Sequence, residues 1–210
     1  MKLNRKKILA LGLALIMALG LAACSGGGSS AGGKVTGIFL SPANLRYQNM
    51  RPQYNYYMTY FDQEEITLMD DGTYCLIISS AMFSALELDE NTNDAKGNER
   101  DNYITKLYGT YTSSVNDLDD RLLDVTLSNP TRVVKSYDQT YWLDTDNWTE
   151  DMGQRVIPPS GYNDMGGAIY DPDAKPLTAE EYLATMTLST TNVQLNTKTA
   201  SFDFTDFGVN

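Results

Sequence analysis

The chain has 210 residues, of which 27 are Asp or Glu and 16 are Lys or Arg, so its formal net charge at pH 7 is −11. This charge disfavours binding to the phosphate backbone of nucleic acid. The sequence contains no His, which excludes Ser-His-Asp and Cys-His catalysis and any metal site that uses imidazole ligands.

The N-terminal segment has the pattern of an export signal. Ile8–Ala23 is an uncharged run of small and aliphatic residues, shorter than the roughly 20 apolar residues of a membrane-spanning helix. Four positive charges precede it, at Lys2, Arg5, Lys6 and Lys7. The alternatives are an ordinary secretory signal with an incidental cysteine and an uncleaved membrane anchor.

The end of this run, Leu21-Ala22-Ala23-Cys24, resembles the lipobox of bacterial lipoproteins. The resemblance implies that residues 1–23 are a signal peptide and that Cys24 receives a diacylglyceryl group, with fatty chains such as palmitate. It also implies that the protein is held on the extracytoplasmic face of the bacterial cell membrane. One acyl chain anchors a protein only marginally, whereas a diacylglyceryl group supplies two chains.

Residues 24–34 are predicted to be the lipidated cysteine and a flexible linker, because 25–33 contains only Gly, Ser and Ala. Loss of residues 1–23 makes the net charge four units more negative. With lipid on Cys24, Cys75 has no partner for an intramolecular disulfide, and its apolar neighbours predict a buried, inert thiol. Residues 35–210 are predicted to form a single β-rich globular domain.

Short apolar stretches predict strands through most of this domain. The clearest hairpin pairs residues 65–69 with 73–80 across Asp70-Asp71-Gly72, because Asp-Gly accommodates the positive φ of a tight turn. Residues 81–88 either extend the hairpin or form a short helix. Residues 89–101 are predicted to be a loop. Gly109, within a later strand, indicates a bulge. The other predicted strands are 35–40, 54–61, 104–112, 121–128 and 131–137, with a final hairpin of 191–195 and 200–204.

Two later regions depart from the strand pattern. Residues 138–176 are rich in Pro, Gly, Asn and Asp and show no periodicity, so they are predicted to be irregular. Residues 178–187 are predicted to form one short helix, with Thr178 and Glu181 in a capping box.

About eight strands that follow one another without helices predict a mainly β fold, an antiparallel barrel or sandwich. Two phrases, Asp71-Gly-Thr-Tyr74 and Tyr108-Gly-Thr-Tyr-Thr112, resemble the strand starts of small lipocalin-like bacterial lipoproteins. That resemblance implies a lipocalin-like barrel.

The residues best suited to binding a ligand lie close together in the irregular segment: Trp142, Asp144, Asp146 and Trp148. Aromatic faces stack on sugar rings, and carboxylates accept hydrogen bonds from sugar hydroxyls, so this stretch is a candidate recognition surface for a glycan or small molecule. The alternative is that both tryptophans close the end of the barrel or sandwich, because large aromatic side chains are mostly buried.

Acidic residues suggest two further possibilities. Asp89, Asn91 and Asn93 place oxygen ligands at alternate positions, as a calcium loop begins, but the sequence then departs from the EF-hand pattern, so the alternative is a solvated acidic loop. Adjacent carboxylates such as Glu64-Glu65 and Asp119-Asp120 suit a hydrolase poorly, because neighbours on a strand point to opposite faces.

These observations favour a non-enzymatic, lipid-anchored binding module of the cell envelope, with a small-molecule or carbohydrate ligand. A structural or interaction protein of an envelope complex, with an unknown protein partner, is the first alternative, and a carboxylate-based hydrolase is the second. No cofactor and no nucleic-acid partner are predicted. A binding module predicts a cavity lined by aromatic residues, and an interaction protein predicts a filled interior with an exposed apolar patch.

Overall fold

The computed structural model describes residues 33–51, 56–88, 95–137, 140–164, 167–205 and 207. All of them belong to one of the two units into which the chain divides, the unit that begins at Gly33. The signal segment, the lipobox and most of the linker lie outside the described residues, and so do the calcium candidates Asp89, Asn91 and Asn93. What the sequence suggests for these residues stays a prediction.

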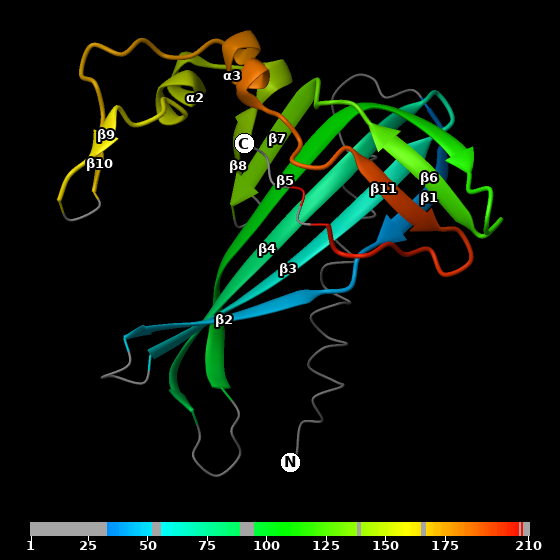
Figure 1. Ribbon diagram of the computed structural model, residues 1–210. Coiled ribbons are helices and arrows are strands. Elements are labelled where there is room, and N and C mark those ends of the chain that lie inside the picture. The colour runs from blue at the N-terminus through cyan, green and yellow to red at the C-terminus, as the bar shows by residue number, and fades with distance from the viewer. Residues whose placement is uncertain are drawn as a thin grey trace. The chain divides into compact units, whose positions relative to one another are not determined.

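Nine strands of the described part of the chain form one antiparallel sheet, which curls into a half-barrel (Figure 1). The three longest strands, β3, β4 and β5, run side by side at its centre. β1 and β2 pair with successive lengths of β3, and β7 and β6 pair with successive lengths of β5. The predicted mainly β, antiparallel fold is confirmed. The strands are β1 (Val35–Leu40), β2 (Asn44–Arg51), β3 (Tyr56–Met69), β4 (Thr73–Leu88), β5 (Ala95–Val115), β6 (Leu122–Leu127), β7 (Arg132–Tyr137), β8 (Thr140–Asp144) and β11 (Asn192–Asn196).

Short elements lie between β8 and β11. They are the 3₁₀ helix η2 (Thr145–Asn147), the helices α2 (Glu150–Arg155) and α3 (Ala179–Thr185), and a small hairpin of β9 (Gly161–Tyr162) and β10 (Ala168–Ile169). The helix predicted near residues 178–187 is confirmed as α3, together with its capping box. Among the described residues, no helix combines the length and apolar character that crossing a membrane requires.

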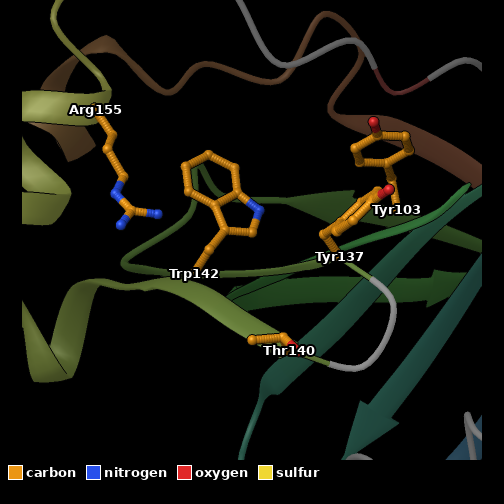
Figure 2. A pocket seen from close by; sticks show the side chains of 5 residues that line it. All are labelled: Tyr103, Tyr137, Thr140, Trp142 and Arg155. Carbon is orange, nitrogen blue, oxygen red and sulfur yellow. The ribbon is translucent and has the colours of Figure 1, made fainter.

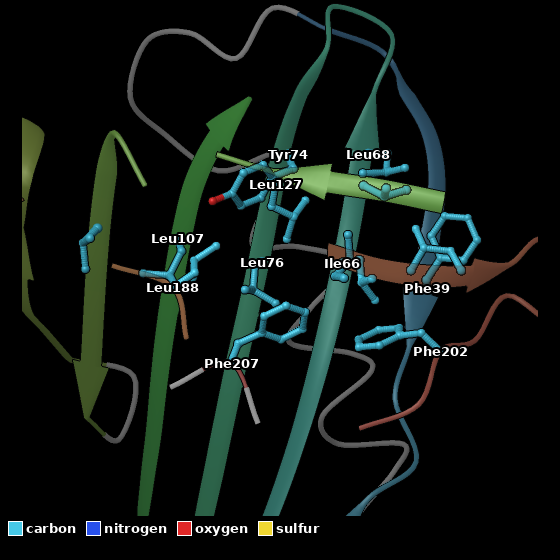
Figure 3. Close-up of a cluster of buried hydrophobic side chains, with 14 of the residues drawn as sticks. Phe39, Ile66, Leu68, Tyr74, Leu76, Leu107, Leu127, Leu188, Phe202 and Phe207 are labelled. Carbon is cyan, nitrogen blue, oxygen red and sulfur yellow. The ribbon is translucent and has the colours of Figure 1, made fainter. Parts of the chain in front are cut away.

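The core lies on one face of the curled sheet. Ile66, Leu76, Leu107 and Val133 pair in that order across four strands, and all four side chains have no exposed surface (Figure 3). Burying each such side chain contributes about 1.5–3 kcal/mol, so this aliphatic row is a main source of stability. Phe202 and Phe207, from the C-terminal segment, pack on the same cluster with their ring centroids 6.3 Å apart.

The predicted hairpin between β3 and β4 is confirmed. Gly72 has φ of +80°, and its N–H donates to the Met69 carbonyl at 3.2 Å, as expected for a three-residue turn that ends in a left-handed residue. Residues 81–88 continue β4 rather than forming a helix. Cys75, on β4, is fully buried, as predicted.

The predicted bulge at Gly109 is wrong. The pairing of β4 with β5 is continuous there, with Gly109 opposite Tyr74. A Cβ at this position would lie 2.7 Å from the Tyr74 ring and 2.7 Å from the Ser128 hydroxyl oxygen. Gly109 is therefore explained by the close approach of an aromatic ring from the neighbouring strand.

Three boundary predictions are also wrong. Residues 95–101, expected in a loop, belong to β5, and the segment expected to be irregular contains β8, η2, α2 and the β9–β10 hairpin. These last elements are too short to show a hydrophobic period. The final hairpin is reduced to one antiparallel bridge between Asn196 and Ser201, and residues 202–204 form no strand, because the chain then turns toward β1, where Ser201 also bridges Leu40. That path directs Phe202 into the core.

Candidate functional site

The candidate site lies on the same face of the sheet as the core, four residues further along each strand. Because every second residue of a strand points to the same face, the aliphatic row is followed by a mixed row and then by a polar and aromatic row. The mixed row pairs Glu64, Ile78, Thr105 and Lys135, and the next row pairs Asp62, Ser80, Tyr103 and Tyr137. The face thus changes from closed and aliphatic to open and aromatic along the same strands.

Tyr103 and Tyr137 form a cross-strand aromatic pair at this open end. Their ring centroids are 5.1 Å apart with an interplanar angle of 48°. Tyr103 is 48% exposed and Tyr137 is 38% exposed, so both rings present much of their surface to solvent. Thr140 is the residue opposite Tyr137 on β8.

Trp142 reaches this surface because of a β-bulge. Lys135 of β7 pairs with Leu143, whereas Ser136 pairs with Tyr141, so Trp142 is the extra residue of β8. Bulges bend a strand and redirect the side chain of the extra residue. Leu143 is fully buried, and Trp142 is partly buried against the edge of the core.

Together these side chains line an open pocket of about 500 Å³. Its lining residues are Tyr103, Tyr137, Thr140, Trp142 and Arg155. Figure 2 shows the Trp142 indole between the Arg155 side chain and the Tyr103–Tyr137 pair. The pocket therefore combines three aromatic rings with a hydroxyl and one guanidinium.

Arg155 reaches the pocket from the end of α2. Thr149 caps the start of this helix, where its hydroxyl oxygen accepts from the Met152 N–H. Arg155 Nη2 lies 2.8 Å from Asp151 Oδ2, one helical turn earlier, and both side chains are more than half exposed. A second cation lies near the indole, since Lys135 Nζ is 5.9 Å from the centroid of the Trp142 ring and 5.8 Å from that of Tyr182.

Asp144 and Asp146 bind Arg132 instead of lining this pocket. Arg132 donates to both oxygens of Asp144, at 3.2 and 3.0 Å, and its Nε lies 3.0 Å from Asp146 Oδ2. Partial burial raises the pKa of Asp144, but hydrogen bonds from Arg132, Asn147 and the Asp146 N–H outweigh it, so the pKa lies below its usual 3.8. The two carboxylates thus fix the chain between β7 and η2.

Trp148 has a packing role. Its Nε1–H donates to the Leu177 carbonyl at 2.9 Å, and its ring lies 5.3 Å from the ring of Tyr182 on α3. A buried indole usually satisfies its N–H in this way. For Trp148, the alternative interpretation of an aromatic that packs against the core describes the contacts better than ligand binding.

The four ligand-binding candidates predicted from the sequence therefore do not form one site. Of the four candidates, Trp142 lies in the pocket, while Asp144, Asp146 and Trp148 contact other parts of the protein. Sequence reasoning missed the other four lining residues. Tyr103 lies on β5, Tyr137 on β7, Thr140 at the start of β8 and Arg155 at the end of α2. Only the sheet register brings them together.

Of the carboxylate pairs considered from the sequence, Glu64 and Glu65 lie on opposite faces of β3, and Asp119 lies in the turn before β6. Glu64 is buried, and its oxygens accept from the Thr205 and Phe207 N–H groups, each at 2.9 Å. Glu65 lies on the opposite face, where burial raises its pKa. Asp119 forms an ion pair with Arg121, in which Asp119 Oδ2 lies 2.6 Å from Arg121 Nη2. Within the described residues, no group of three or more acidic, His or Cys side chains is placed to hold a metal ion.

Comparison with known proteins gives no match for this chain among family models, curated proteins or solved structures.

Proposed function

We propose that this chain is a lipid-anchored, extracytoplasmic module that binds a glycan at the open pocket around Trp142. The observation that carries the proposal is the set of three aromatic side chains, from β5, β7 and β8, that meet at one pocket and stay partly open to solvent. A concave site with aromatic walls and a few polar groups is the usual form of a small-ligand site. The core row fills the face along β3, β4, β5 and β7, so the proposed site lies at the open end of that face.

The pocket chemistry suits a sugar ring. The faces of pyranose rings carry C–H groups that pack on indole and phenol rings, and their hydroxyls need hydrogen-bond partners at the edge. The pocket supplies such partners in the Tyr hydroxyls, the Thr140 hydroxyl, the Trp142 N–H and the Arg155 guanidinium. Binding there needs no nucleophile and no cofactor.

The membrane anchor follows from the lipobox resemblance. The linker after Cys24 has a root-mean-square reach on the order of 15–20 Å, which keeps the domain clear of the lipid headgroups. Mass spectrometry of the native protein is expected to find Cys24 as the lipid-modified N-terminus. A native protein that still begins with Met1, or one with an unmodified Cys24 thiol, would contradict this part of the proposal.

Calorimetric titration of the full chain in detergent micelles tests glycan binding. A panel of short oligosaccharides is expected to contain a saturable ligand, and Trp142→Ala is expected to weaken its affinity at least tenfold while the domain stays folded. Tyr162→Ala is the matched control, because Tyr162 is 69% exposed on the β9–β10 hairpin and does not line the pocket. Equal losses in both variants, or unfolding of Trp142→Ala without a prior change in binding, would refute the proposal.

The β9–β10 hairpin supports a second candidate, an interaction protein of an envelope complex. Tyr162, Ile169 and Tyr170 are 69%, 48% and 59% exposed on or next to this hairpin. Exposed apolar side chains that gather on one element are typical of protein-binding sites. A photoreactive residue at position 162 is then expected to give a discrete protein adduct in intact cells, whereas one at Leu118, which is 97% exposed elsewhere, is not.

A further inference from the structure

The local charge at the pocket differs in sign from the net charge of the chain. The sequence has 27 acidic and 16 basic residues, yet among the described residues that line the pocket Arg155 is the charged one and none is a carboxylate. Lys135 adds a second cation beside the Trp142 ring. Two cations near one aromatic ring, of which Arg155 is balanced by the exposed Asp151, suggest a role for charge in what binds there.

Arg155 is available to a ligand, in contrast to Arg132. The Arg132 side chain is 20% exposed and contacts two carboxylates, so it is held in place. The Arg155 side chain is 55% exposed and pairs with Asp151, which is itself 69% exposed. A solvent-exposed pair between neighbours on one helix is weak, so an incoming anion can take the place of Asp151.

The position of Arg155 fits an anion attached to a ring that stacks on Trp142. Figure 2 shows the guanidinium directed toward the indole, on the side away from the tyrosine pair. A guanidinium presents two parallel N–H groups that match the oxygens of a carboxylate or a phosphate. We infer that the ligand is an acidic sugar, whose ring packs on Trp142 and whose anionic group accepts hydrogen bonds from Arg155.

This inference rests on the proposed glycan function and narrows it. The net negative charge of the domain does not oppose it, because at physiological ionic strength the field of distant surface charges is screened within about 8 Å. Charges in direct contact with the ligand then decide its affinity. A short acidic oligosaccharide meets the local cations, whereas a long polyanion also meets the acidic surface around the pocket.

The test compares charged and neutral forms of the same sugar by calorimetry on the full chain. One pair is trigalacturonic acid and its methyl ester, and a second pair is glucose 6-phosphate and glucose. The charged member of at least one pair is expected to bind about tenfold more tightly than the neutral member, as one charge-assisted contact implies. The pair that shows the difference identifies the anionic group as a carboxylate or a phosphate.

Three variants test whether Arg155 is responsible for the preference for the charged sugar. Arg155→Gln is expected to remove the tenfold preference while the neutral sugar binds as before. Asp151→Asn is expected to strengthen binding of the charged sugar severalfold, since it removes the internal competitor. Arg121→Gln is the matched control, because Arg121 is 58% exposed, also pairs with a neighbouring Asp, and lies beyond the far end of β5.

The outcomes separate the two proposals. Neutral and charged sugars that bind equally well would overturn the acidic-sugar inference and leave the glycan function standing. Equal losses in Arg155→Gln and Arg121→Gln would also overturn it, because the preference would then reflect overall charge. No binding of either member, for these pairs and the wider panel, would overturn both.

Discussion

The two ends of one sheet face behave in opposite ways. The row of Ile66, Leu76, Leu107 and Val133 is completely closed, whereas four residues along the same strands, about 13 Å away, Tyr103 and Tyr137 are 48% and 38% exposed. The backbone pairing is continuous between the two rows from β5 to β7. The difference lies in the side chains and in what covers them: aliphatic groups and the C-terminal segment at one end, aromatic rings with polar tips at the other.

The contrast separates stability from recognition. At the closed end, burial of each aliphatic side chain stabilises the folded state, and no apolar surface of these side chains is left in contact with water. At the open end, apolar ring surface stays in contact with water, so the corresponding free energy becomes available only when a ligand covers it. The following variants measure how sharply the two ends differ.

The largest effect is expected at the closed end. Leu76→Ala should lower the free energy of unfolding by about 2–5 kcal/mol, because the lost methyl groups leave a cavity that rigid neighbours cannot fill. Tyr103→Ala, on the same face at the open end, should lower it by less than about 1 kcal/mol. Urea unfolding of the full chain measures both, and similar losses would show that the open end is part of the core.

The next effect concerns the segment that covers the closed end. In Glu64→Gln, one of the two acceptor oxygens becomes an NH₂ group that cannot accept from the Thr205 or Phe207 N–H. The loss of a charged, buried acceptor is expected to cost about 1–3 kcal/mol. Faster amide exchange at residues 205 and 207 should accompany it.

Glu65→Gln is the matched control for that variant. Burial raises the pKa of Glu65, so its ionised form at neutral pH is disfavoured in the folded protein, and replacing it with a neutral amide is expected to leave stability unchanged or raised. A greater loss for Glu65→Gln than for Glu64→Gln would contradict the assignment of the two carboxylates.

Gly109 tests whether the closed end tolerates added volume. In Gly109→Ala, the new methyl group meets the Tyr74 ring and the Ser128 hydroxyl, and overpacking of this kind costs about 1–3 kcal/mol. Gly161→Ala, where a Cβ meets nothing within 4 Å, should be neutral. Thermal unfolding distinguishes the two, and equal melting temperatures would count against the close approach of Tyr74.

The smallest effect is expected at the ion pair of Arg132 with Asp144, next to Val133 on β7. The pKa of Asp144 is lowered in the folded state, so its stabilising effect is complete above the ordinary value of 3.8 and is lost as the pH falls through the lowered value. The melting temperature of Asp144→Asn should therefore lie below that of the wild type at pH 6, and the difference should shrink as the pH falls below 3.8. A difference that persists at low pH would mean that Asp144 acts through packing rather than charge.

The sequence predicts features that depend on neighbouring residues better than it predicts the open end. Short-range signals suffice for the β3–β4 turn at Gly72, the α3 capping box and the buried Cys75, because each depends on residues within one turn or strand. Trp142 was also found from its local composition. Tyr103, Tyr137 and Arg155 were not, because residues 103 and 137 meet only through the register of β5 with β7.

The division of the Trp142–Trp148 stretch shows a second limit. Both tryptophans and both carboxylates lie close together in the sequence, and composition alone gives them equal weight. The bulge at Trp142 and the Trp148 bond to Leu177 send the two rings to different surroundings. Neither feature has a sequence signal, since each depends on a partner strand or on a loop residue distant in the chain.

Fluorescence of single-tryptophan variants tests the central claim most directly, because Trp142 and Trp148 are the two tryptophans of the chain. In Trp148→Phe, the emission of Trp142 is expected to change and saturate as the bound oligosaccharide is titrated. In Trp142→Phe, the emission of Trp148 should stay constant over the same range. A saturable change from Trp148, or none from Trp142 at a sugar concentration that calorimetry shows to be saturating, would contradict the assignment of the open pocket as the binding site.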